Sequence, residues 1–296
     1  MPSVYIKDKQ KLKGIRYMLL AVAAINAAAA IVFAYLESFR DIALPMYLES
    51  LAIGLLAYVI PIFVYAKITK MTAKEASEKF YLRKCKNHLV VLAAIMGVCC
   101  QFVIIVINLP LNLIYKASSS YMPKSEAELA AAIVIIAIIP AIFEEFLFRG
   151  IVFGSMAEMN SKAALIFSSV MFAVLHADLY GFLGYFFMGI VLAFVLRRCD
   201  SVYPAVAFHF TNNLTALLLG YFDPYLQYSP SLIIVLFLIG IIGFLVLLIL
   251  FGGITKKPKS IEKIKCTQIL GQSFINFPII LCFVVIVASV TIMRML

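Results

Sequence analysis

The sequence predicts an all-α protein, a polytopic transmembrane helix bundle with eight or nine spans. Of its 296 residues, 64% are hydrophobic and only 14% are charged, whereas soluble domains carry about a quarter charged residues. The mean hydropathy is +1.04, and the apolar residues form long unbroken runs rather than the short alternating segments of a membrane β-barrel. Lipid offers no partners to backbone N–H and C=O groups, so such runs must cross the bilayer as helices.

Nine apolar segments are candidate spans, because about 20 helical residues cross a hydrocarbon core. The fifth and sixth are short and must be tilted, incomplete or sheltered by neighbouring helices. No internal repeat and no low-complexity linker interrupts the chain, so we expect a single integral membrane domain over residues 1–296. The nine segments are 15–36, 45–66, 88–109, 129–154, 162–177, 181–197, 203–220, 231–252 and 273–294.

The basic residues predict the orientation of these spans. With a cytoplasmic N-terminus and alternating spans, 21 of the 25 Lys and Arg residues fall on the cytoplasmic side. The exceptions are Arg40, Lys116, Lys124 and Arg294. Cytoplasmic loops of membrane proteins carry such an excess, so we expect a multi-pass integral membrane protein with its N-terminus in the cytoplasm.

The formal net charge of +10 has the same explanation. The positive charges lie in loops, where they can contact anionic headgroups, so we expect membrane lipid as a partner and no nucleic acid. The six cysteines include no Cys-x-x-Cys pair. Cys85, Cys199 and Cys266 lie in basic segments and Cys99 and Cys100 in an apolar run. This pattern is typical of reduced thiols rather than of a disulfide framework or a zinc ribbon.

Charged side chains inside a span are costly and are therefore candidates for function. The fourth segment carries three of them, in the stretch Glu144-Glu145-Phe-Leu-Phe-Arg149, a few residues after Pro140. In an α-helix Glu145 and Arg149 stack on one face with the acid first, so Arg149 can neutralise Glu145. Glu144 points about 100° away and has no partner on its own helix, which makes it a candidate general base.

Two of the three histidines also lie inside predicted spans. His176 comes late in the fifth segment, one turn after Phe172, and His209 lies in the seventh. His209 and Asn213 are four residues apart, so an imidazole and an amide share a helix face and can converge on one small group. His88, at the mouth of the third segment, is expected at the interface.

We expect these side chains to line one water-filled cavity between segments four, five and seven. Glu144 with His176 would activate a water molecule for attack on a carbonyl carbon, and His209 and Asn213 would stabilise the oxyanion that forms. A Glu–Arg pair or a single histidine can also serve helix packing alone. A transporter or a bacteriocin-immunity factor could use the same cavity without catalysis, but we find no inverted repeat of the kind that many transporters have.

One geometric difficulty remains in this arrangement. Measured along their helices at about 1.5 Å per residue, Glu144 and His176 lie roughly 24 Å from the cytoplasmic loops, and His209 only about 13 Å. Tilted or broken helices are needed to bring the three side chains to one level.

At three motifs the chain resembles the type II family of CAAX prenyl proteases, also called the CPBP or Abi family. The resemblance covers about residues 128–220, expected to form a catalytic core, while the other spans match only as generic membrane helices. The motifs, on separate spans and in the family's order, are Glu144-Glu145-x-x-x-Arg149, Phe172-x-x-x-His176 and His209-x-x-x-Asn213.

The resemblance implies an intramembrane endopeptidase. Eukaryotic members cut a prenylated CAAX protein after the lipidated Cys and release a tripeptide. Prokaryotic members act on other membrane-associated or secreted peptides, and some are linked to bacteriocin maturation or self-immunity. Asn212 is an adjacent alternative to Asn213, and the family's spacing selects the latter. The implied roles are the water-activating base for Glu144, its partner for His176, the oxyanion hole for His209 and Asn213, and support for Glu145 and Arg149.

A site with these residues could act either with a metal ion or without one. One carboxylate and two imidazoles, here Glu144, His176 and His209, are also the ligand set of a catalytic zinc ion. We expect a metal-free glutamate mechanism, because in the zinc arrangement Glu145 would have to act as the base while Arg149 engages it. The expected partner in either case is a peptide or protein substrate that reaches the site from the membrane.

Overall fold

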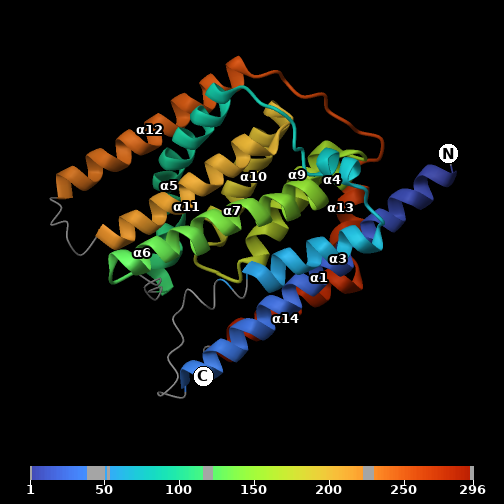
Figure 1. Ribbon diagram of the computed structural model, residues 1–296, viewed down its shortest axis with the longest axis horizontal. Helices are drawn as coiled ribbons and strands as arrows, with labels where there is room; N and C mark the ends of the chain where they lie inside the picture. Colours follow the sequence, from blue (N-terminus) through green and yellow to red (C-terminus); the bar gives the residue numbers. More distant parts are fainter. Residues whose placement is uncertain (1, 39–50, 52–53, 116–122, 223–229, 294–296) are drawn as a thin grey trace. The chain divides into compact units, whose positions relative to one another are not determined.

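The computed structural model describes residues 2–38, 51, 54–115, 123–222 and 230–293, and most of them are helical (Figure 1). No residue in these ranges belongs to a β-strand, and one isolated bridge joins Asn160 to Glu262. The predicted all-α class is therefore confirmed. The elements are α1 (Pro2–Ser38), η1 (Gly54–Val59), α3 (Ile60–Ile68), α4 (Ala73–Lys79), α5 (Asn87–Tyr115), α6 (Glu126–Ala132), η2 (Ile133–Ile138), α7 (Ile139–Glu144), η3 (Glu145–Phe153), α8 (Gly154–Ala157), α9 (Ser161–Leu175), α10 (Phe182–Cys199), α11 (Val202–Phe222), α12 (Pro230–Ile254), α13 (Cys266–Phe274) and α14 (Phe277–Met293).

Each of the nine predicted apolar segments falls on a helix of the described chain. Five helices are long and apolar enough to cross a membrane, and α13 with α14, bent by 56° at their junction, counts as a sixth. The other three are shorter or more polar: Gly54–Ile68 and α9 have fewer than 18 residues, and α11 carries the polar residues of the third motif. Residues 45–50 of the second predicted segment lie outside the described ranges.

The chain groups into two compact units, each built from separate stretches of sequence. The first comprises Met1–Phe80, Phe146–Ala177 and Lys259–Leu296, and the second comprises Tyr81–Glu145 and Asp178–Pro258. This grouping does not test the expectation of one domain over residues 1–296 with a catalytic core at 128–220, which stays a prediction.

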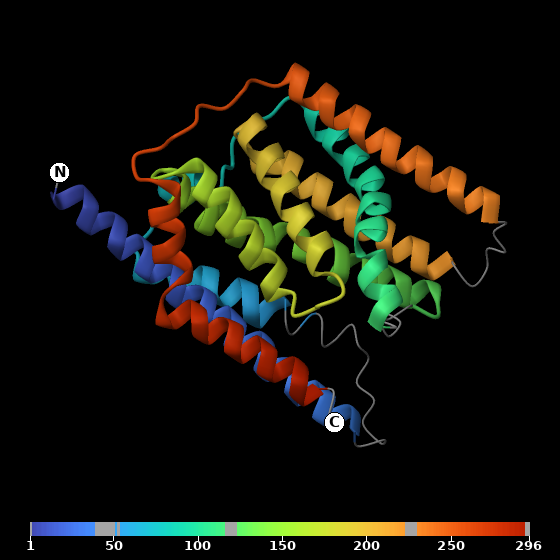
Figure 2. The ribbon, with the colours of Figure 1, turned by 180° about the vertical axis from the view of Figure 1, so that it is seen from behind.

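In the first unit, α1 and α14 lie side by side, as both ribbon views show (Figures 1 and 2). The 15-residue helix α9 contacts both of them as well as α13. Its first turn is capped by Asn160, whose Oδ1 accepts hydrogen bonds from the backbone N–H groups of Lys162 and Ala163, each at 2.9 Å. The Nδ2 of the same side chain donates to the carbonyl of Ile264 at 2.9 Å. One asparagine thus begins α9 and fixes the segment that leads into α13.

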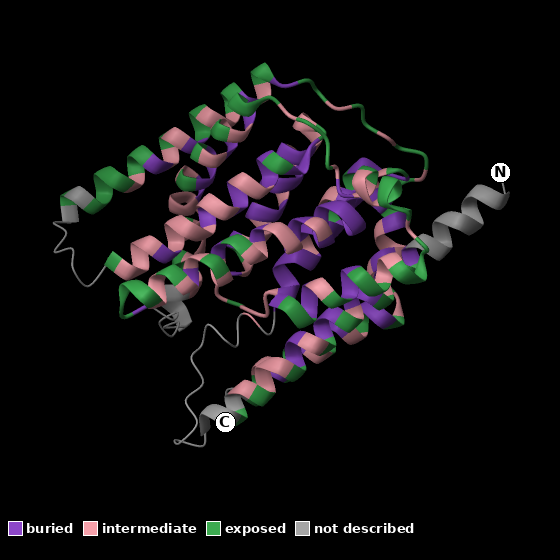
Figure 3. Cartoon of the chain, viewed as in Figure 1, coloured by how far each residue is buried: buried purple, intermediate pink, exposed green. Residues whose placement is uncertain are grey.

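In the second unit, α11 packs along α5, and α5 also contacts α10 and α12. Gly97 permits the close approach of α5 to α11, because a Cβ atom there would lie 2.2 Å from the carbonyl oxygen of Phe208. Small residues allow this kind of contact between membrane helices. Much of α12 is exposed although its residues are apolar (Figure 3), as expected for a helix whose outer face meets lipid.

The helix from Glu126 to Ala157, 32 residues long, carries the first motif. It begins at the N-cap Ser125, whose hydroxyl accepts a hydrogen bond from the backbone N–H of Glu128. Two of its stretches, η2 and η3, are wound as π-helix, with α7 between them. Proline in the first turn of α7 supplies no N–H for the regular hydrogen-bond ladder, which is a common place for a helix to change its winding.

Candidate active site

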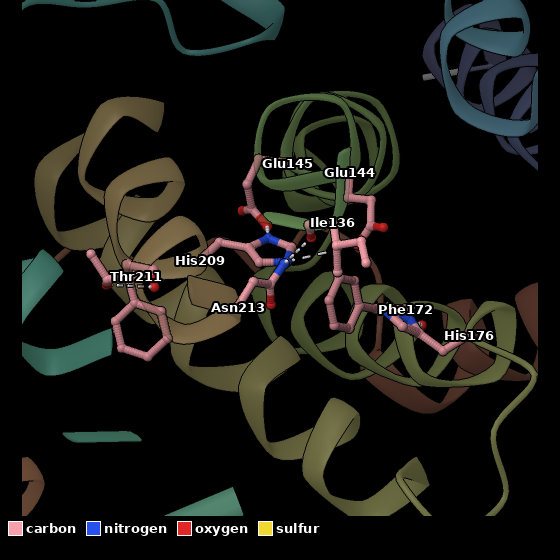
Figure 4. Close-up of polar contacts among 9 residues, drawn as sticks. Ile136, Glu144, Glu145, Phe172, His176, His209, Thr211 and Asn213 are labelled. Atoms are coloured by element: carbon pink, nitrogen blue, oxygen red, sulfur yellow. Dashed lines mark hydrogen bonds and ion pairs between the residues drawn. The ribbon is translucent and has the colours of Figure 1, made fainter. Parts of the chain in front are cut away.

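Two carboxylates and one imidazole meet inside the second unit. The side chains of Glu144, Glu145 and His209 are all buried, with exposed fractions of 5%, 0% and 1%. The Nδ1 atom of His209 lies 3.0 Å from Oε1 of Glu145 and makes a hydrogen bond with it. Its Nε2 atom lies 3.9 Å from Oε2 of Glu144. Figure 4 shows the ring of His209 with both carboxyl groups beside it.

The local winding explains how two adjacent glutamates reach one ring. Glu144 is the last residue of α7 and Glu145 the first residue of the π-wound stretch η3. Successive side chains on a helix diverge by about 100°, so the two carboxylates point apart and leave room for a flat ring between them. The imidazole has its two nitrogen atoms on different edges, and it presents one to each carboxylate.

Three consecutive polar residues of α11 anchor the histidine's helix to its neighbours. Thr211 donates its hydroxyl to the carbonyl of Ala94 on α5 at 2.7 Å. Asn212 donates its amide to the carbonyl of Gly97 at 3.2 Å. Asn213 donates its amide to the carbonyl of Ile136 in η2 at 3.3 Å. His209 is therefore carried on a helix whose position is fixed by side-chain hydrogen bonds on two sides.

The first unit contains the second motif, at the end of α9. His176 is the C-cap residue of that helix, and its Nδ1 atom lies 2.6 Å from the carbonyl oxygen of Phe172. A carbonyl can only accept, so Nδ1 donates the hydrogen bond. The rings of Phe172 and His176 also contact each other, with centroids 4.6 Å apart and planes tilted by 56°. The next residue, Ala177, has a φ of 52°, and this left-handed residue ends the helix.

Arg149 and Phe148 complete the surroundings of Phe172 in the first unit. The guanidinium carbon of Arg149 lies 4.5 Å from the centre of the Phe172 ring, a cation–π contact in a fully buried setting. Phe148 packs edge-on against the same ring at 5.1 Å. The two halves of the first motif thus contribute to different units, because the boundary falls between Glu145 and Phe146.

The structure brings together some of the predicted site residues. Glu144 and Glu145 meet His209, so the difference in depth expected between Glu144 and His209 from their positions along the chain does not occur. His176 and Arg149 are placed within their own unit beside Phe172. The predicted pairings of His176 with Glu144 and of Arg149 with Glu145 each involve one residue from each unit. They therefore stay predictions.

Several residues of the site were not predicted from the sequence. Asn26, buried in α1, donates its amide to the carbonyl of Leu175 at 3.3 Å, immediately before His176. Gly97 and Thr211 set the contact between α5 and α11. An asparagine or a glycine in the middle of an apolar run is a signal that could have identified the first two, since both residue types are costly there without a partner or a close contact.

A zinc ion would need a third ligand besides Glu144 and His209. Within the part of the chain that the structure describes, no group of three His, Cys, Asp or Glu side chains has a geometry suited to a metal ion. The third ligand of the zinc alternative is His176, which belongs to the other unit. The hydrogen bond between Nδ1 of His209 and Glu145 is compatible with both the metal-free and the zinc mechanism, because zinc-bound histidines also donate their second N–H to a carboxylate.

Comparisons with known proteins concern the middle of the chain. Residues 126–215 match the family model described as type II CAAX prenyl endopeptidase Rce1-like. A stretch of 82 residues is 37% identical to the protein named "Putative membrane peptidase YdiL" of Bacillus subtilis (strain 168). That stretch makes up 27% of this chain and 34% of the relative, so the chain spans about a third of the length of the curated relative it matches. Residues 126–215, which the family model matches, include all three motifs, so this segment is similar to a membrane peptidase family.

Proposed function

We propose that this multi-pass membrane protein is an intramembrane endopeptidase, which hydrolyses a peptide bond in a membrane-associated protein or peptide. The observation that carries the proposal is the buried group of Glu144, Glu145 and His209, within the segment that matches the peptidase family. Burying two carboxylates inside a helix bundle is expensive, and packing alone gives no reason for it. Hydrolysis needs a base and a polarising donor at one place, and this group supplies both.

Glu144 is the proposed base. Its Oε2 atom and Nε2 of His209 are 3.9 Å apart, too far for a direct hydrogen bond. One oxygen atom at ordinary hydrogen-bonding distance can contact both atoms at that separation. We place the attacking water there, so that Glu144 takes one of its protons as the new C–O bond forms.

His209 and Asn213 are the proposed oxyanion hole. The hydrogen bond from Nδ1–H of His209 to Glu145 fixes the plane of the ring. In the imidazolium form the ring also carries an Nε2–H, which points away from Glu145 and can donate to the oxyanion. Asn213 uses its amide on the carbonyl of Ile136, but an amide has a second N–H, which can reach a substrate. Donors fixed before the reaction stabilise the developing negative charge without reorganisation of the site.

His176 is the proposed partner of Glu144 in activating the water. With Nδ1–H donated to the carbonyl of Phe172, its Nε2 atom would accept a hydrogen bond from the attacking water and orient it, while Glu144 takes the proton and later gives it to the leaving amine. Arg149 lies over the ring of Phe172, the residue whose backbone carbonyl accepts this hydrogen bond. This role requires His176 to face Glu144, and the variants below test it.

The experiment compares Glu144→Ala and His176→Ala with the unchanged protein, purified in detergent or in liposomes. The probes are two matched peptides that end in Cys-aliphatic-aliphatic-x, one farnesylated and one not, and mass spectrometry detects the products. Loss of a general base lowers the rate by about 10²–10⁴-fold, so both variants should lose cleavage while their thermal unfolding stays near that of the parent. Glu126→Ala, at the exposed start of α6, is the control and should retain full activity.

Retained cleavage in either variant would refute the assignment of that residue. A non-enzymatic transporter or immunity factor instead predicts that both alanine variants keep the full biological effect. The ratio of cleavage of the two peptides measures whether a prenyl group is required.

The proposed mechanism uses no metal ion, and this part is tested separately. We expect activity to survive treatment with a strong chelator, and metal analysis of the purified chain to find less than stoichiometric zinc. One zinc per chain that is lost in His209→Ala would establish the zinc alternative, with Glu144, His176 and His209 as ligands.

A further inference from the structure

Two cysteine side chains meet in the second unit, away from the groups used in the proposed reaction. Cys85 lies in the segment between α4 and α5, and Cys199 is the last residue of α10. Both are free thiols and half-buried, and their side chains are hydrogen-bonded to each other. The remaining four cysteines include the adjacent pair Cys99 and Cys100 inside α5.

The backbone around the two cysteines runs in opposite directions and is held in a fixed register. The N–H of Val202 donates to the carbonyl of Tyr81 at 3.0 Å. The hydroxyl of Ser201 donates to the carbonyl of Arg83 at 2.7 Å, and the guanidinium of Arg83 pairs with Asp200. The contacts join Tyr81 to Val202 and Arg83 to Ser201 and Asp200, so the two stretches run antiparallel. Cys85 lies two residues beyond Arg83 and Cys199 one residue before Asp200, so this register brings the two cysteines to neighbouring positions.

We infer that Cys85 and Cys199 are a modification site, where a small-molecule disulfide of the glutathione class converts two thiols into one reversible intramolecular disulfide. The proposal rests on the thiol contact and on the register of the flanking hydrogen bonds. It does not depend on the peptidase activity. The reduced thiols expected from the sequence are the starting form of this reaction.

The chemistry takes place in two exchanges. The Cys85 thiolate attacks one sulfur of glutathione disulfide, which forms a mixed disulfide and releases one glutathione thiolate. The Cys199 sulfur then attacks the Cys85 sulfur, loses its proton to the solvent and releases the second glutathione thiolate. Two protein thiols are oxidised and one glutathione disulfide is reduced to two glutathione molecules. Because both thiols are on one chain and in contact, the second exchange outcompetes attack by another glutathione.

The disulfide would join the beginning of α5 to the end of α10. The α5 helix also provides the carbonyls of Ala94 and Gly97 that hold α11, so the cross-link braces the same helix group that carries His209. A sulfur–sulfur bond is about 2.05 Å long, so cross-linking shortens the present hydrogen-bonded contact between the two thiols.

The test treats the full chain, purified in detergent, with oxidised glutathione, followed by alkylation of the remaining thiols and peptide mapping by mass spectrometry. The expected result is one cross-linked peptide pair that contains Cys85 and Cys199, the loss of two alkylatable thiols per chain, and full reversal by dithiothreitol. A stable glutathione adduct without the cross-link, or a disulfide between two chains, would overturn the proposal. This measurement needs no variant and therefore does not depend on how a variant folds.

Variants sharpen the result. Cys85→Ser and Cys199→Ser should each abolish the cross-link, and Cys266→Ser, a half-buried thiol elsewhere, should leave it unchanged.

Asp200→Asn removes the ion pair with Arg83 but keeps a residue type that tolerates the left-handed φ of 51° at this position. This variant should slow cross-linking by about two- to fivefold, which corresponds to the free energy that an exposed ion pair contributes. Lys84→Ala removes a neighbouring charge that is outside the register contacts and should leave the rate unchanged. Equal rates in Asp200→Asn and the parent would show that the register does not bring the thiols together.

Discussion

At the scale of single residues, His209 is held in its orientation by the groups around it. Its two ring nitrogens face two different carboxylates, at 3.0 Å and 3.9 Å. The shorter contact orients the ring, and the longer one leaves room for a reacting oxygen. In the proposed mechanism the two glutamates, adjacent in sequence, have different tasks: Glu145 positions the histidine, and Glu144 faces the substrate.

Glu145→Ala and Glu145→Gln separate these tasks. Alanine removes the acceptor for Nδ1 of His209, so the oxyanion donor loses its orientation, and we expect kcat to fall by about 10²–10³-fold, the usual cost of one such donor. Glutamine keeps an oxygen acceptor at the same place and should lose less. Steady-state kinetics with either peptide checks this, and equal losses in the two variants would contradict a positioning role.

Helix spacing alone predicted part of this arrangement. The spacing of His209 and Asn213 placed them on one face, and the structure has both on α11. The hydrogen bond between His209 and Glu145 joins residues on two helices, and nothing in the local sequence encodes which acceptor the ring selects. The sequence-based assignment of Arg149 as the partner of Glu145 assumed α-helical spacing, whereas this stretch is wound as π-helix. The same spacing rule therefore carries less weight there.

At the scale of elements, the sequence predicted every helix that holds a motif. Apolar length and loop charges were sufficient because the bilayer allows a spanning segment few alternatives. The bends and caps were harder to predict. The break between α13 and α14 and the π-wound stretches depend on packing against neighbouring helices. The mean hydropathy of a sequence segment carries no information about that packing.

Asn160 gives a direct test of how α9 begins. Asn160→Ala removes the cap on two backbone N–H groups and should lower stability by about 1–2 kcal/mol. Asn160→Asp keeps the accepting oxygen and loses only the donor to the carbonyl of Ile264, so its melting temperature in detergent should fall less. A larger fall for the aspartate variant would mean that the link to Ile264 matters more than the cap.

The other end of α9 offers the opposite prediction. Ala177 adopts a left-handed conformation that costs an L-residue about 1–2 kcal/mol. Ala177→Gly should therefore raise stability by about 0.5–1 kcal/mol, after the larger unfolded-state entropy of glycine is subtracted. Ala130→Gly, inside α6, is the matched control and should cost about 1 kcal/mol. Destabilisation by both changes would contradict the assigned role of this C-terminal residue.

At the scale of the whole molecule, the distribution of basic residues predicts the orientation in the membrane. The exposed Lys74 in α4 should be cut by trypsin in inside-out vesicles and protected in right-side-out vesicles. Lys124, before α6, should show the reverse pattern. Mass spectrometry of the released peptides reads both sites in one experiment, and cleavage of Lys74 from the outside would invert the predicted topology.

The π-wound stretches have a consequence for how this protein can change in length during evolution. A π turn closes its hydrogen bond over one residue more than an α turn. The helix that contains Ile133–Ile138 therefore holds a surplus residue ahead of Pro140. A single-codon deletion in this stretch can be absorbed by rewinding to α-helix, without a gap in the span. The same event would turn the carbonyl of Ile136 away from Asn213, so insertions and deletions at this point would alter the catalytic face before they cost the protein its fold.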